Sequence, residues 1–75
     1  MTAEMLKEGE SGVIKALFHS EKIRGKLMDM GALPGVRITL LRRAPFGGPA
    51  EFALLGYTLA IRLEDAGKIV LQEVE

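Results

Sequence analysis

The sequence predicts a mainly β fold: a small five-stranded barrel with one α-helix between the first two strands and a short helical turn before the last strand. The apolar runs are short and are bounded by Gly and Pro, as is typical of strands. Only one segment has helical periodicity. In a chain of 75 residues, five half-apolar strands would expose sheet edges unless the sheet closed, so we expect a barrel with the helix over one opening.

The first part of the chain predicts a strand and then a helix. Residues 13–18 form a short apolar run between breakers, which indicates a buried strand. Ser20 is a favourable N-cap for a helix over 21–30, and Gly31 follows it at a position where glycine adopts positive φ without strain. The apolar positions that share one helical face are Ile23, Leu27 and Met30.

The rest of the chain alternates turns and strands. On the strand expected over 36–43, side-chain alternation directs Val36, Ile38 and Leu40 toward the core. The expected elements are, in order, a turn at 32–35, that strand, a Pro- and Gly-rich loop at 44–49, strands over 51–55 and 58–63 joined at Gly56 and Tyr57, a helical turn at 64–67 and a last strand over 68–74.

Length and composition predict one domain over residues 1–75, in which 1–8 is a loosely ordered N-terminal segment. The apolar share of 48% is sufficient for a core, and the absence of cysteine excludes disulfides and thiolate metal sites. No apolar run approaches the roughly 18 residues of a membrane span. The first eight residues carry three charges and lack the apolar region of a signal peptide. We therefore expect a cytoplasmic chain without direct membrane insertion.

The inventory of catalytic groups predicts that the chain is not an enzyme. His19 is the only histidine, and its place beside the helix start favours a surface or capping role. Ser11 and Ser20 lack the context of a catalytic triad. Gly47 and Gly48 are not followed by the Lys and Ser or Thr of a phosphate-binding loop. We expect no cofactor and no dedicated metal site.

The formal net charge is zero, but basic residues concentrate in the middle of the chain. Only Glu21 and Asp29 oppose them between residues 11 and 50. This distribution is compatible with a docking face for an acidic partner or with solvated charges on outer faces. The basic residues of this region are Lys15, Lys22, Arg24, Lys26, Arg37, Arg42 and Arg43.

Five short motifs carry a resemblance to a known family. They are, in order, Arg24-Gly25-Lys26-Leu27, Met30-Gly31-Ala32, Pro34-Gly35, Ala44-Pro45-Phe46-Gly47-Gly48-Pro49 and Gly56-Tyr57-Thr58-Leu59-Ala60-Ile61-Arg62. In this order and spacing they resemble the FeoA family, the small cytosolic proteins of bacterial ferrous iron uptake. The resemblance runs from about Gly9 to Val74. It departs from the family pattern at Ala32, where Leu is usual, and at Gly48, where Asp is usual.

The resemblance implies an SH3-like barrel that acts on FeoB, the membrane transporter whose cytosolic portion carries a GTP-binding domain. It implies no movement of iron by the chain itself. We therefore expect a regulatory protein of ferrous iron uptake that reaches the inner face of the plasma membrane through this transporter.

The residues expected to contact the transporter lie in three segments. Phe46 is an aromatic on a loop with no evident core to fill, and aromatic anchors dominate interfaces. The alternative for Phe46 is that it folds back over the mouth of the barrel, and the alternative for Arg24 is that it pairs with Asp29 or a strand carbonyl. The expected contact residues are Lys22, Arg24 and Lys26 on the helix, Leu33 and Pro34 in the turn after it, and Pro45 and Phe46 in the following loop.

A second hypothesis is an SH3-like barrel of the kind found at the C-terminus of iron-dependent repressors, binding metal, protein or nucleic acid. A nucleic-acid surface would use Arg37, Arg42 and Arg43. The zero net charge and the few aromatic residues argue against it, so no nucleic-acid partner is expected. The docking side, the sign of the effect on the transporter and the oligomeric state are left open.

Overall fold

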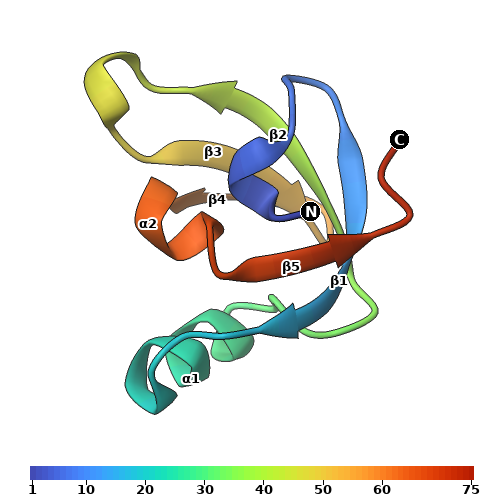
Figure 1. Ribbon diagram of the computed structural model, residues 1–75, viewed down its shortest axis with the longest axis vertical. Coiled ribbons are helices and arrows are strands. Elements are labelled where there is room, and N and C mark those ends of the chain that lie inside the picture. Colours follow the sequence, from blue (N-terminus) through green and yellow to red (C-terminus); the bar gives the residue numbers. More distant parts are fainter.

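The computed structural model describes residues 1–75 and contains one five-stranded antiparallel sheet, two α-helices and two 3-10 turns (Figure 1). The prediction of a mainly β chain, with a helix between the first two strands and a helical turn before the last, is confirmed. The elements are, in order, η1 (Ala3–Met5), β1 (Ser11–Leu17), α1 (Glu21–Asp29), β2 (Arg37–Arg43), η2 (Pro45–Gly47), β3 (Ala50–Leu54), β4 (Tyr57–Ile61), α2 (Leu63–Ala66) and β5 (Ile69–Gln72).

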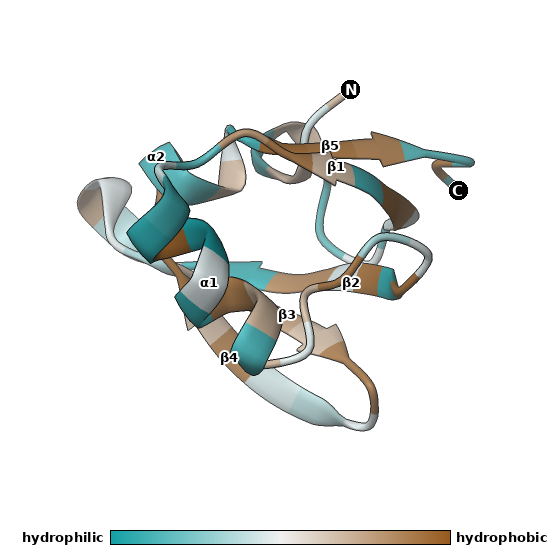
Figure 2. Cartoon of the chain, turned by 90° about the horizontal axis from the view of Figure 1, so that it is seen from below, coloured by the Kyte–Doolittle hydropathy of each residue, from teal (hydrophilic) through white to brown (hydrophobic).

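The sheet is open, and the expectation of a closed barrel is corrected accordingly. The strand order is β4-β3-β2-β1-β5, so β4 and β5 are edges and do not pair with each other. The sheet bends until β1 and β5 lie on one side of the core and β2, β3 and β4 on the other (Figure 2). Bulges at Lys15 and Leu41 each insert an unpaired residue, which increases the local bend and twist.

The core fills the space between these two layers. Ile38 and Leu40 are fully buried and Val36 is half-buried, so the predicted inward face of β2 is confirmed. Leu41, which follows Leu40 and is the extra residue of the bulge, is exposed. Each large apolar side chain stabilises the fold by about 1.5–3 kcal/mol through its burial. The largest fully buried side chains are Phe52, Leu6, Ile14, Ile38, Leu40 and Ile69.

Helix α1 forms at the predicted place but ends at Asp29, and Met30, expected on the apolar face with Ile23 and Leu27, is the C-cap and is exposed. The Ser20 hydroxyl accepts a hydrogen bond from the Ile23 backbone N–H at 3.4 Å, which caps the first turn. Leu27 is buried, and Ile23 packs against the core. Gly31 follows the helix with φ +97°, the positive value expected there. None of the helices is both long and apolar enough to span a membrane.

The hairpin between β3 and β4 turns one residue earlier than predicted. Leu54 pairs with Tyr57, so the two turn residues are Leu55 and Gly56, and both have positive φ. This is the backbone of a type I′ turn, for which Asn-Gly is the usual sequence. A leucine at its first position gives no recognisable turn signal, which explains the shifted prediction.

The N-terminal segment packs against the sheet, whereas it was expected to be loosely ordered. Ala3 and Leu6 are buried in the core. The Arg43 guanidinium donates hydrogen bonds to the carbonyl oxygens of Glu4 and Leu6, the latter at 3.0 Å. Leu6 follows Met5 and precedes two charged residues, so its burial was not evident from local sequence. The segment is fixed by two buried apolar residues and one arginine from β2.

The same segment covers the outer edge of β5. Thr2 forms a β-bridge with Val70, and the Leu71 N–H donates to the Met1 carbonyl oxygen at 2.7 Å. Figure 1 shows the N-terminus lying beside β5. One of the two sheet edges is therefore covered by the chain itself.

A close contact joins the end of α1 to the β3–β4 hairpin. A Cβ atom placed on Gly31 would lie 2.7 Å from Leu55 Cδ1 and 2.8 Å from the Tyr57 hydroxyl. Both distances are shorter than van der Waals contact. Only glycine meets the positive φ and the steric limit at this position.

We predict that Gly31→Ala lowers the free energy of unfolding by about 1–2 kcal/mol, mainly through backbone strain at positive φ, because the exposed ends of Leu55 and Tyr57 can move aside. Thermal or denaturant unfolding followed by circular dichroism measures the loss. Gly25→Ala is the matched control: no atom lies within 4 Å of its Cβ position, and alanine favours a helix interior by about 1 kcal/mol. Equal stability of Gly31→Ala and the native chain would contradict the prediction.

Candidate protein-binding site

The cations of α1 are exposed and make no ion pair. The structure contains two ion pairs, Arg42–Glu51 and Arg62–Glu64, and neither involves the helix. Arg24 therefore does not pair with Asp29, one of the alternatives considered for it. Hydrophilic colour covers much of α1 in Figure 2. Lys22 and Lys26 are spaced i, i+4 and therefore lie on one side of the helix.

An exposed apolar patch surrounds Gly31. Met30 precedes this glycine, and the Leu33 N–H donates to its carbonyl oxygen at 2.9 Å. Leu55 and the Tyr57 hydroxyl approach it from the hairpin. The exposed fractions are 40% for Met30, 39% for Leu33, 62% for Leu55 and 42% for Tyr57. We call these four residues the Gly31 patch.

The Gly31 patch contains one of the predicted contact residues, Leu33, and adjoins a second, Pro34, which is exposed. Sequence reasoning did not select Leu55 or Tyr57. The sequence feature that could have indicated Leu55 is a leucine in a hairpin turn, a position where an apolar side chain has no core to fill. An exposed apolar cluster of this kind, next to unpaired cations, is typical of a protein-binding surface.

Phe46 projects from the loop between β2 and β3. It is fully exposed and has φ +60° and ψ +33°, a left-handed conformation that is uncommon for a bulky residue. It does not fold back over the core. Pro45 precedes it at the start of η2 and is also exposed.

The predicted contact residues form two separate surfaces. Figure 1 places the loop that carries Pro45 and Phe46 at one end of the molecule and α1 at the opposite end. The helix cations, Leu33 and Pro34 thus belong to the surface around Gly31, and Phe46 belongs to a second one. A single small ligand cannot contact both.

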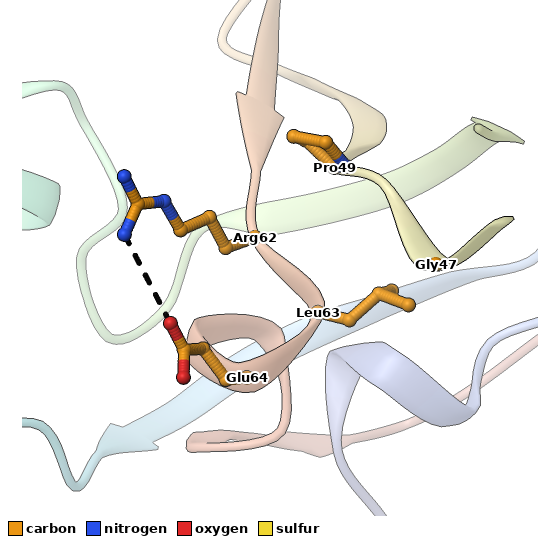
Figure 3. A pocket seen from close by; sticks show the side chains of 5 residues that line it. All are labelled: Gly47, Pro49, Arg62, Leu63 and Glu64. Carbon is orange, nitrogen blue, oxygen red and sulfur yellow. Dashed lines mark ion pairs between the residues drawn. The ribbon is translucent and has the colours of Figure 1, made fainter. Parts of the chain in front are cut away.

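A shallow pocket of about 350 Å³ lies beside the Phe46 loop. Figure 3 shows its five lining residues, with Leu63 extending toward the loop and Arg62 and Glu64 directed to the other side, where they face each other at 3.9 Å. The two charges are exposed and approach only each other. The pocket therefore lacks the several convergent polar groups of a small-molecule site.

His19 is buried, whereas a surface or capping role was expected. Its Nε2 lies 2.6 Å from the Asp65 carbonyl oxygen and donates to it, while Nδ1 has no hydrogen-bond partner. This bond ties the end of β1 to α2. The chain holds no group of three or more His, Cys, Asp or Glu side chains that could bind a metal ion together.

Two of the three arginines proposed for nucleic-acid binding have partners within the chain. Arg42 Nε lies 2.8 Å from Glu51 Oε1. The Arg43 guanidinium is bonded to carbonyl oxygens of the N-terminal segment. On this strand only Arg37 makes no ion pair or hydrogen bond through its side chain. Strand β2 therefore carries little concentrated positive charge.

Comparison with known proteins identifies the family. The model of the FeoA domain matches residues 1–73. A curated relative, the Fe(2+) transport protein A/Fe(2+) transporter FeoB fusion protein of Porphyromonas gingivalis, is 29% identical over 72 residues. The alignment covers 96% of this chain and 8% of that protein, so the chain spans less than a tenth of its relative's length.

Solved structures agree with this match. FeoA of Chlorobium tepidum is 30% identical, with 96% of this chain and 69% of that chain covered and a TM-score of 0.91. FeoA of Stenotrophomonas maltophilia, an SH3 domain protein complexed with zinc, is 22% identical, with 100% and 95% covered and a TM-score of 0.86. The expected SH3-like fold is confirmed, with an open sheet in place of a closed barrel.

The repressor proteins of the second hypothesis share only their fold with this chain. A manganese-dependent transcriptional repressor in complex with manganese is 18% identical, with 96% of this chain and 35% of that chain covered and a TM-score of 0.87. By contrast, the family model extends over nearly the whole sequence. This chain therefore belongs to the FeoA domain family.

Proposed function

We propose that this protein is a cytosolic accessory protein of ferrous iron uptake that binds the GTPase-bearing cytosolic part of an FeoB-like transporter and regulates it. The observation that carries the proposal is the fusion relative, in which a region similar to this chain is joined to an FeoB transporter. A permanent covalent link between two domains is useful when both work at the same place, because it raises their effective concentration.

The two exposed surfaces support a binding role. At the Gly31 patch, apolar side chains lie next to unpaired cations of α1, a combination suited to an acidic protein surface with an apolar centre. At the opposite end, Phe46 presents a whole aromatic ring to solvent. We propose that the contact residues are Lys22, Arg24, Lys26, Leu33, Pro34, Pro45 and Phe46, together with Leu55 and Tyr57.

Binding of this chain to the transporter can be measured directly. The full chain should bind the purified cytosolic domain of the FeoB-like transporter from the same organism, and the affinity should fall as salt rises because unpaired cations contribute. Biolayer interferometry at low and moderate salt, without nucleotide, with GDP and with a GTP analogue, measures this. Absence of binding in all three nucleotide conditions at low salt would overturn the proposed function.

The exposed ring of Phe46 is the expected aromatic anchor of the complex. We expect Phe46→Asn to weaken transporter binding about 5- to 30-fold, the effect of losing an aromatic anchor worth about 1–2 kcal/mol. Asparagine tolerates the left-handed backbone, so the fold should keep its thermal stability. Phe18→Asn is the matched control, because Phe18 is also an exposed aromatic but lies outside both surfaces. Equal affinities of the two variants would exclude Phe46 as an anchor.

A further inference from the structure

The two edges of the sheet differ in how they are covered. The N-terminal segment bridges to Val70 and hydrogen-bonds to Leu71 along β5. Strand β4 packs extensively only against β3. We propose that the open edge of β4 is a docking site for an extended segment of the transporter, which adds to the sheet as a sixth strand. This inference rests on the proposed function and specifies how the transporter is bound.

The hairpin register determines which backbone groups are free. Because Leu54 and Tyr57 close a two-residue turn, Tyr57, Leu59 and Ile61 exchange hydrogen bonds with β3. Thr58 and Ala60 lie at the alternate positions, so their N–H and C=O groups point away from β3. Neither residue makes a hydrogen bond elsewhere in the chain. The edge thus presents two donors and two acceptors in the spacing that an added strand requires.

The edge also lacks the usual protection against strand addition. Proteins guard such edges with charged residues, proline or a bulge. The segment Tyr57-Thr58-Leu59-Ala60-Ile61 contains no charge and no proline, and its pairing with β3 has no irregularity. The outward side chains, Thr58 and Ala60, are exposed. In contrast, β1 and β2, which are paired on both sides, contain the bulges.

The side chains next to the edge indicate what kind of segment fits. Leu59 faces the core but is only half-buried, and Tyr57 in the Gly31 patch is exposed on the same side. An added strand would cover both with alternate apolar residues. Unpaired cations on α1 favour carboxylates at the hairpin end of that strand. The expected ligand is therefore an extended segment with apolar alternation and an acidic end.

The size of the edge favours the transporter over a second copy of this chain. Five residues of strand span about 17 Å, and one added strand buries far less than the roughly 1,600 Å² of a typical stable interface. In the proposed complex the transporter also contacts the Phe46 surface, and in the fusion relative the transporter is joined covalently to the FeoA-like region, so a small contact suffices there.

The test removes the free backbone N–H at position 60 by a proline substitution. In Ala60→Pro the ring occupies the outward position, where proline is tolerated because no bond to β3 is lost. We expect this variant to fold with nearly unchanged thermal stability and to bind the transporter cytosolic domain at least tenfold more weakly. The matched control, Ala60→Thr, keeps the N–H and should bind as the native chain does. Native-like binding of Ala60→Pro would overturn the inference.

Hydrogen exchange gives an independent readout. In the free chain the amides of Thr58 and Ala60 should exchange quickly, and those of Leu59 and Ile61 slowly. In the complex with the transporter cytosolic domain, residue-resolved exchange should show protection of Thr58 and Ala60. Binding without that protection would overturn strand addition and leave the proposed function standing, whereas absence of any binding would overturn both. Protection that rises with the concentration of the chain alone would assign the edge to a second copy.

Discussion

The fold depends on the bending of a sheet that is too small to close. Five short strands enclose a core only if the sheet folds over itself, and the bulges at Lys15 and Leu41 supply the extra residues that permit this. The same bend brings Leu6, from the N-terminal segment, into contact with the interior. It also leaves two edges that do not meet. One is covered by the chain, and the other remains available, so the architecture that makes the core also makes the candidate docking edge.

The surface around Gly31 depends on one steric relation. The helix ends at a residue without a side chain, and Leu55 and Tyr57 occupy the space that a Cβ would need. Because of this contact, apolar residues from α1, the following turn and the β3–β4 hairpin form one patch. It adjoins the start of β4. The helix, the hairpin and the open edge are therefore coupled, and a segment bound along β4 would touch all three.

The sequence predicted the elements governed by local rules. The Ser20 cap, the spacing of Ile23 and Leu27, and Gly31 defined α1, and alternation defined the inner face of β2. Long-range relations were not predictable. Nothing near Arg43 indicates that it binds carbonyls of the N-terminal segment, and nothing near His19 indicates its bond to Asp65. The family resemblance marks Ala32 as a departure from the usual Leu, and because this residue is fully buried, its effect is on packing.

The candidate surfaces coincide with places where local conformational rules are broken. Three residues other than glycine have positive φ, and two of them, Phe46 and Leu55, are exposed apolar residues. Each such conformation costs about 1 kcal/mol or more. For Leu55, the contact with Gly31 offsets part of that cost. Phe46 has no such compensation, because its ring is fully exposed. A strained aromatic without internal contacts is difficult to explain by stability, whereas contact with another molecule would supply the missing free energy.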